Sequence, residues 1–159
     1  MPSRSRPLSS VDFNPTFFVD RNIGYSVVQV IEDAGYQAIY HDTRFPPTTP
    51  DTEWLREAGR NGWIVLSQDE NIARNVNELV ALIDARVHAF FIVLKRQTGE
   101  ILAEVVERSI TQMVEIAARK DPPSLGLIRL DGKVGRLEGW DQLRDRVQSQ
   151  VDRIGLDQA

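Results

Sequence analysis

The chain alternates short, fully apolar runs with longer segments in which apolar residues recur every three or four positions. The apolar runs lie at 17–19, 63–67 and 88–94, and a mixed run lies at 36–41. Such runs are typical of strands buried in a parallel sheet. The segment 99–119 has the clearest helical spacing, and the alternation as a whole predicts a parallel sheet covered by helices on both faces.

Further helices are expected between the strands, at 23–34, 49–60 and 70–84. Thr49 is the predicted N-cap of the second helix and Pro50 its first helical residue, since proline at that position loses no helical hydrogen bond. The stretch before Thr49 is too rich in proline for a helix or a central strand, so it is predicted to be a loop.

The pattern changes after two consecutive prolines at 122–123. Asp131-Gly132 separates two short apolar stretches, which predicts a hairpin, and a last amphipathic helix is expected at about 140–154. The predicted organisation is a flexible tail at 1–14, one α/β domain at 15–120, and a hairpin and helix extension at 121–159 that packs on the same domain.

Composition places the chain among soluble globular proteins. Its 159 residues fit one domain, and 42% hydrophobic with 26% charged residues is an ordinary balance for a folded chain. With no cysteine, disulfides, thiol catalysis and cysteine zinc sites are excluded. No run is long enough to span a membrane and no secretory signal opens the chain, so a cytoplasmic protein without membrane association is expected.

Acidic residues follow three of the predicted strands. Asp20 comes directly after the first strand, Asp42 after the second, and Asp69 two residues after the third. Asp51 and Glu53 lie in the first turn of the helix between the second and third strands. Because parallel strands end at one side of their sheet, where sites usually form, these carboxylates are expected to lie near one another.

Each acid also has a local explanation, which the sequence leaves open. Asp20 has the chemistry of a helix cap, although Asn22, one residue before the expected helix, is the better placed cap. Asp51 suits the positive end of a helix dipole, and Asp69 is an ordinary acid for a first turn. Asp42 precedes a proline-rich loop and suits a turn.

Gathered carboxylates repel one another and take up protons unless a cation lies among them. A hard divalent ion such as Mg²⁺ or Mn²⁺ prefers all-oxygen ligands of this kind. The reaction that fits is metal-assisted hydrolysis of a phosphodiester, in which ions activate a water and stabilise the leaving oxygen. The net charge of −4 argues against a protein that coats nucleic acid by charge alone, but it is compatible with such a nuclease.

Residues 16–95 resemble PIN-like domains, through the segments FFVDRNIG, AGYQAIYHD, PDTEWL, NGWIVLSQDENIARN and HAFFIVL. They are most similar to the PIN-like ribonuclease toxins of VapC-type toxin–antitoxin pairs. The resemblance implies a three-layer α/β/α fold with a mainly parallel four- to five-stranded sheet, followed here by the hairpin and helix. It also implies a metal-dependent endoribonuclease that uses Mg²⁺ or Mn²⁺, a cognate antitoxin as partner, and self-association as a homodimer.

The family's acidic residues map onto Asp20, Asp51 and Asp69, which the resemblance makes the metal ligands and catalytic residues. The second acid is often a glutamate in the family, so Asp51 and Glu53 both stay candidates for it. A fourth acid has no clear counterpart, although Asp42 and Glu70 are weak substitutes, and this leaves a one-metal or a two-metal site open.

Three basic residues are candidate contacts to RNA phosphates: Arg21, Arg74 and Lys95. Arg21 is equally suited to an ion pair with a carboxylate. Two other functions stay open, a catalytically inactive PIN-like module for RNA binding or assembly and a receiver-like phosphoacceptor. The receiver fold needs a pair of acids directly after the first strand, and Asp20 stands there alone.

Overall fold

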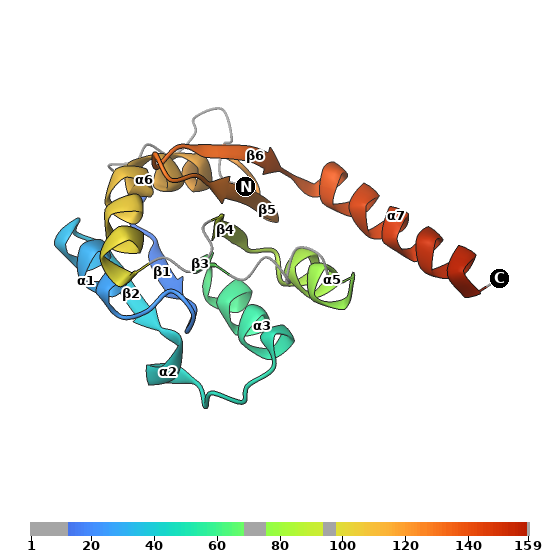
Figure 1. Cartoon of the computed structure of the whole chain (residues 1–159), viewed down its shortest axis with the longest axis horizontal. Coiled ribbons are helices and arrows are strands. Elements are labelled where there is room, and N and C mark those ends of the chain that lie inside the picture. The colour runs from blue at the N-terminus through green and yellow to red at the C-terminus, as the bar shows by residue number, and fades with distance from the viewer. Residues whose placement is uncertain (1–12, 69–75, 94–97, 159) are drawn as a thin grey trace, which may run out of the picture.

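The computed structural model describes residues 13–68, 76–93 and 98–158, which form an α/β domain around a six-stranded sheet (Figure 1). The strands are β1 (Thr16–Val19), β2 (Gln37–Tyr40), β3 (Ile64–Ser67), β4 (His88–Ile92), β5 (Ser124–Ile128) and β6 (Val134–Glu138). The helices are α1 (Ser26–Asp33), α2 (His41–Arg44), α3 (Asp51–Asn61), α5 (Val76–Ala85), α6 (Gly99–Arg119) and α7 (Trp140–Gln158).

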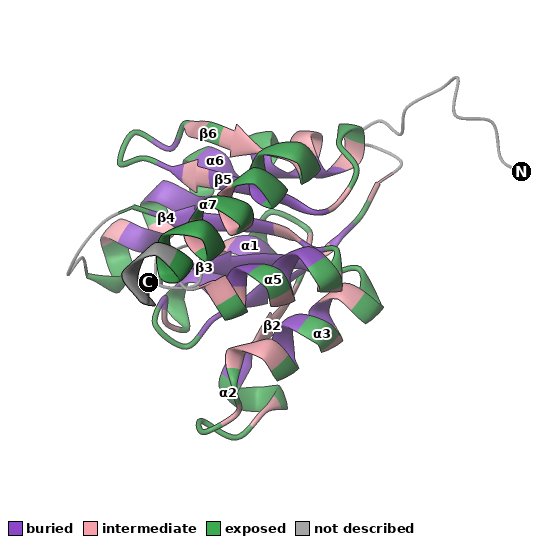
Figure 2. Cartoon of the chain, turned by 90° about the vertical axis from the view of Figure 1, so that its right-hand side faces the viewer, coloured by how far each residue is buried: buried purple, intermediate pink, exposed green. Residues whose placement is uncertain are grey.

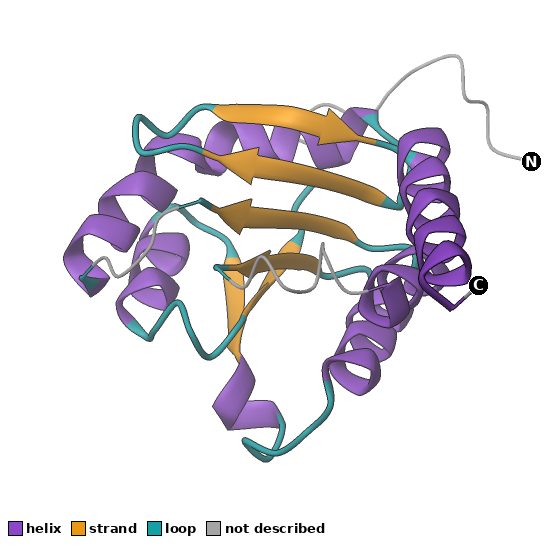
Figure 3. Ribbon diagram, turned by 45° about the vertical axis from the view of Figure 1, so that its right-hand side comes forward, coloured by secondary structure: helices purple, strands orange, loops and turns teal. Residues whose placement is uncertain are grey.

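The strand order is β2-β1-β3-β4-β5-β6, and every pairing is parallel except that of β5 with β6. Figure 3 shows the outermost strand running opposite to its neighbour. The predicted α/β architecture is confirmed, but the sheet has more strands than the four to five expected. The reason is that the predicted hairpin is not separate from the sheet, because its first strand pairs in parallel with β4, from His88–Ser124 to Ile92–Ile128.

One face of the sheet packs against α1 and α6. Alternate residues of β1, Phe17 and Val19, point to this face and are fully buried with residues of β3 and β4. Val27 and Ile31 of α1 cover them together with an apolar stripe of α6. Figure 2 shows the central strands β3 and β4 buried beneath helices whose outward sides are exposed. Phe13, ahead of β1, also packs against this core.

The opposite face packs against α3, α5 and the first turns of α7. Phe18 of β1 points to this face and stacks on Trp54 and Trp63, with ring centroids 5.1 Å and 5.7 Å away. Both tryptophans are buried and belong to the core on this face. Leu143 of α7 is also fully buried there, whereas the rest of that helix extends away from the sheet (Figure 1).

Two helix starts differ from the sequence prediction. The first helix begins at Ser26 and not at residue 23, because Gly24, with φ of +94°, turns the chain before the helix starts. Asn22 is therefore not its N-cap. The third helix begins at Asp51 with Pro50 as its N-cap residue, one residue later than expected, and no side chain caps it.

The loop predicted before α3 begins with a short helical turn, α2, which follows β2 without a break. None of the helices in the described part of the chain combines the length and apolarity needed to cross a membrane.

Gly59 offers a test of the packing between α3 and α5. A Cβ atom at Gly59 would lie 1.9 Å from the backbone oxygen of Ala85, so Gly59→Ala should force the two helices apart. We expect this substitution to lower the free energy of unfolding by about 1–3 kcal/mol, measured by urea denaturation.

Gly155 in the exposed part of α7 is the matched control, since a Cβ there meets nothing within 4 Å. Gly155→Ala should leave the stability unchanged or raise it by up to about 1 kcal/mol, because alanine is the better helix former. Equal effects of the two substitutions would contradict the packing described here.

Candidate acidic site at the carboxyl end of the sheet

Strands β1, β2 and β3 end on the same side of the molecule, which we call the carboxyl end of the sheet. Val19 of β1 pairs with Leu66 of β3, so the next residue of each segment, Asp20 and Ser67, lie side by side. The Asp20 N–H donates to the Leu66 carbonyl oxygen at 3.0 Å, which extends the sheet pairing to this residue. The sheet therefore fixes Asp20, which is only 7% exposed.

Both oxygens of the Asp20 carboxylate accept hydrogen bonds. Ser67 Oγ donates to Oδ2 at 2.8 Å, and the Arg21 backbone N–H donates to Oδ1 at 2.7 Å. Neither donor belongs to the first turn of a helix, so Asp20 is not the helix cap that the sequence left open. Burial raises the pKa of Asp20, and the charge of Asp51 raises it further, while the bonds from Ser67 and Arg21 and the proximity of His41 lower it.

Asp51 approaches Asp20 from the start of α3. Its half-buried carboxylate accepts a hydrogen bond at 2.9 Å from Nε1 of Trp54, one helical turn later. Trp54 is fully buried against Phe18, so the indole holds Asp51 at a defined position. The charge of Asp51 contributes to the raised pKa of Asp20. Glu53, the alternative second acid, is exposed.

Asp42 takes part in a different set of contacts. Its Oδ1 atom lies 2.8 Å from Nε of Arg21 and 2.9 Å from Nδ1 of His41. His41 is buried among the rings of Phe18 and Trp54. Of the two roles predicted for Arg21, the structure contains the ion pair with a carboxylate, that of Asp42. This pair connects the loop after β1 to α2.

Tyr40, the last residue of β2, completes this end of the sheet. Its hydroxyl donates to the Arg21 carbonyl oxygen at 3.2 Å. Burial and the neighbouring Asp42 and Asp20 carboxylates raise the pKa of Tyr40, while Arg21 lowers it. On its other side Tyr40 contacts the ring of Tyr25, with centroids 5.8 Å apart and planes at 84°.

Asp20 and Asp51 thus interact electrostatically at this end of the sheet, and Asp42 pairs with Arg21, the residue that follows Asp20. Four sequence-predicted residues, Asp69, Glu70, Arg74 and Lys95, lie outside the described residues. Within 13–68, 76–93 and 98–158, no group of three or more histidine, aspartate or glutamate side chains is placed to hold a metal ion.

Sequence reasoning missed three residues that support the acids: Ser67, His41 and the indole N–H of Trp54. Ser67 had a recognisable signal, because it ends an apolar strand next to the one that leads to Asp20. A partner for Asp51 three residues along the same helix was also foreseeable from helical spacing. The sequence carries no comparable signal for His41, because its proximity to Asp20 depends on how β2 pairs with β1.

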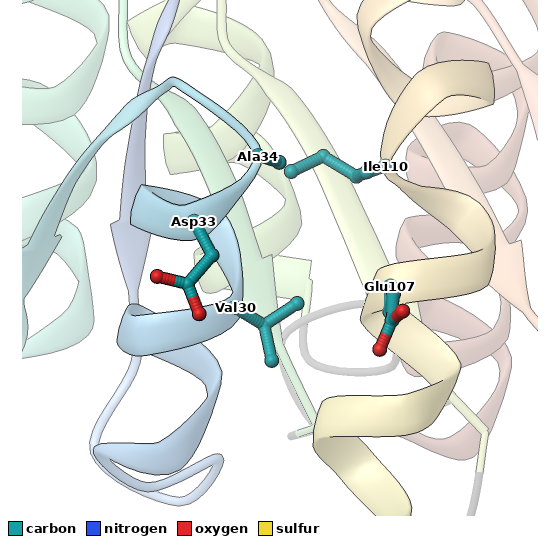
Figure 4. Close-up of a pocket in the computed structure, with 5 residues that line it drawn as sticks. All are labelled: Val30, Asp33, Ala34, Glu107 and Ile110. Carbon is teal, nitrogen blue, oxygen red and sulfur yellow. The ribbon is translucent and has the colours of Figure 1, made fainter.

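A hollow lies between α1 and α6, away from the acids. It has a volume of about 310 Å³ and is lined by Val30, Asp33, Ala34, Glu107 and Ile110 (Figure 4). Two carboxylates flank its aliphatic floor. Asp33 and Ala34 are at the C-terminal end of α1, whereas the acidic site is at the N-terminal end of that helix, so the two features are separate.

Comparison with known proteins agrees with this arrangement. Residues 15–93 match the family model described as PIN-like domain, and this segment includes the strands that carry Asp20 and Ser67 and the helix that carries Asp51. No curated protein and no solved structure matches the chain. PIN-like domains form a superfamily that consists largely of nucleases. The segment from residue 15 to residue 93 is a PIN-like domain.

Proposed function

We propose that the protein is a metal-dependent endoribonuclease that cleaves RNA phosphodiesters and is the toxin of a type II toxin–antitoxin pair. The observation that carries the proposal is the pair of carboxylates, Asp20 and Asp51, held at the carboxyl end of the sheet within a PIN-like domain. A buried acid whose pKa is raised by its burial and by a neighbouring carboxylate, as for Asp20, is more common at functional sites than elsewhere.

The donor set suits a divalent ion of the Mg²⁺ or Mn²⁺ type. Asp20 and Asp51 supply only oxygen, and each carboxylate oxygen that accepts one hydrogen bond retains a lone pair for a cation. Because burial and mutual repulsion raise the pKa of Asp20, a cation between the two would favour their charged forms. Asp69, from the sequence, is the proposed third ligand. When bound, the metal supplies an activated water and stabilises the leaving oxygen.

The remaining residues keep the acids in position. Ser67 and the Arg21 backbone N–H orient the two oxygens of Asp20, and Trp54 orients Asp51. Hydrogen bonds of this kind to ligating carboxylates commonly affect metal affinity or activity by about 10- to 100-fold. We therefore assign Ser67 and Trp54 as positioning residues, and Asp51 is a better candidate than the exposed Glu53 for the second acid.

Arg21 is the proposed contact to the RNA backbone. Asp42 engages its Nε atom, which leaves further guanidinium N–H groups for a phosphate. The ion pair with Asp42 also limits how far the side chain can move, so the cation stays next to the acids. Arg21 would thus have both predicted roles, since its ion pair with Asp42 positions the guanidinium that contacts the phosphate.

The toxin assignment rests on the resemblance to VapC-type proteins. It implies a cognate antitoxin and action in the cytoplasm, and self-association as a homodimer belongs to the same proposal. A small reading frame beside this gene whose product copurifies with the chain and blocks RNA cleavage would support the pairing. A chain that cleaves RNA but has no such partner would be a ribonuclease with another role.

Asp20→Asn should reduce metal-dependent RNA cleavage by at least about 100-fold, because it removes a charged ligand and keeps its shape. Expression of the wild-type chain should arrest growth, and expression of this variant should not. The measurements are cleavage of total RNA with Mg²⁺ or Mn²⁺ and growth after induction.

Asp33→Asn is the matched control, because Asp33 is exposed and bonded to Gln29 at the far end of α1. It should cleave RNA at the wild-type rate. Cleavage by Asp20→Asn at that same rate would rule out the assignment, and an inactive wild-type chain that still binds RNA would favour the module without catalysis.

Ser67→Ala should change the pH dependence of cleavage. The hydroxyl lowers the pKa of Asp20, so its removal raises that pKa further, and the carboxylate form needed for a cation appears only at higher pH. The acid limb of the pH–rate profile should therefore move to higher pH, with a loss of about 10- to 100-fold at neutral pH. Ser67→Thr should restore both the position of the acid limb and the rate at neutral pH. An unchanged acid limb in Ser67→Ala would show that the hydroxyl does not act through Asp20.

Millimolar Mg²⁺ or Mn²⁺ should raise the melting temperature of the wild-type chain by a few degrees, on the order expected when a ligand binds only the folded state. The shift should disappear in Asp20→Asn and in Asp51→Asn and persist in Asp33→Asn. Differential scanning fluorimetry with and without a chelator measures it. A shift of equal size in all four proteins would show that the ions bind elsewhere.

A further inference from the structure

We propose that Tyr25 is a stacking surface for an unpaired base of the RNA, next to the phosphate that the acidic site cleaves. This inference rests on the proposed function and adds the form of the substrate, a single-stranded segment whose base can leave its neighbours. It also assigns a binding role to a residue outside the acidic site.

Tyr25 is unusually exposed for its size, with 61% of its surface accessible. This is the largest exposed fraction of any large hydrophobic residue in the described part of the chain. It occupies the N-cap position of α1 but makes no capping hydrogen bond from its side chain. Serine, threonine, asparagine and aspartate are the residues favoured there, so helix formation does not explain a tyrosine. Core packing does not explain it either, because the ring faces solvent.

The ring nevertheless has a defined orientation. It meets Tyr40 in an edge-to-face arrangement, with planes at 84° and centroids 5.8 Å apart. Such a contact occupies at most one face of a ring, so the exposed Tyr25 keeps a face open to solvent. The backbone beneath it is also fixed, because the next residue, Ser26, donates from Oγ to the Gly99 carbonyl oxygen at 3.1 Å and ties the start of α1 to α6.

A short chain of contacts connects this ring to the acidic site. Tyr40 contacts Tyr25 and donates its hydroxyl to the Arg21 carbonyl oxygen. Arg21 follows Asp20 directly, and its N–H holds the Asp20 carboxylate at 2.7 Å. An aromatic face, a guanidinium and a buried carboxylate thus follow one another across the carboxyl end of the sheet.

Aromatic faces next to a cation bind single-stranded nucleic acid, because an unpaired base stacks on the ring while the cation contacts its phosphate. A base inside a duplex has both faces covered by its neighbours and cannot make this contact. The net charge of −4 gives the chain little general attraction for phosphates, so a stacking contact should make up an appreciable part of its affinity.

The test is the binding of a fluorescent single-stranded RNA of about 12 nucleotides, measured by anisotropy in an Asp20→Asn background so that the probe is not cleaved. Tyr25→Leu should weaken binding about tenfold, and Tyr25→Phe should retain it. Trp140→Leu is the matched control, because Trp140 is 49% exposed but follows β6, on the opposite end of the sheet, and it should have no effect. A duplex of the same sequence should bind weakly to every variant.

An abasic scan distinguishes stacking from a general disturbance of the loop. At one position of the RNA, removal of the base should weaken binding to the Asp20→Asn parent about as much as Tyr25→Leu does. The same abasic RNA should bind the Tyr25→Leu variant no more weakly than the intact RNA does. Equal binding by Tyr25→Leu and the parent, or additive effects of the two changes, would overturn the stacking proposal. Wild-type cleavage that Asp20→Asn abolishes would still stand in that case, whereas a chain without RNA binding or cleavage would overturn both proposals.

Discussion

The acidic site depends on the burial of one carboxylate at the end of β1. Asp20 is almost enclosed, and its position follows from sheet pairing that continues one residue past the strand. An ionised group in such a place is unfavourable unless hydrogen bonds or a cation compensate for the lost water. Ser67, from a neighbouring strand, and the backbone of Arg21 provide the hydrogen bonds. The second carboxylate, Asp51, instead raises the pKa of Asp20 and so disfavours its charged form. The proposed cation between the two would relieve this repulsion.

The aromatic core on the α3 side serves the site as well as the fold. Phe18 stacks on Trp54, and the same indole donates its N–H to Asp51, so the position of an acid is determined by packing in the interior. His41 lies against the same rings and contacts Asp42, which in turn holds Arg21. Charged groups from three separate segments are thereby fixed by one buried cluster, and a change in that cluster would alter the electrostatics of the surface above it.

The sequence was sufficient for the architecture and for part of the site. Short apolar runs and helical spacing predict a buried parallel sheet, and acids after successive strands predict where carboxylates meet. The side-chain pairings were less accessible. Whether Arg21 meets a phosphate or a carboxylate, and which acid lies nearest Asp20, depends on the strand order and on the exact start of each helix. Gly24 delays α1, and Pro50 with extended backbone angles is itself the N-cap residue of α3. Local capping rules therefore assigned Asn22 and Thr49 to roles that they do not have.

The pairing of β5 with β6 shifts register between Leu125 and Leu127, and Arg136 within β6 has a positive φ of 46°. Both irregularities disrupt the unpaired backbone N–H and C=O groups that an edge strand would otherwise present to another chain. At the other side of the sheet, β2 is only four residues long and passes directly into α2. The sheet is therefore a poor template for addition of a strand from a second molecule, which disfavours edge-to-edge aggregation.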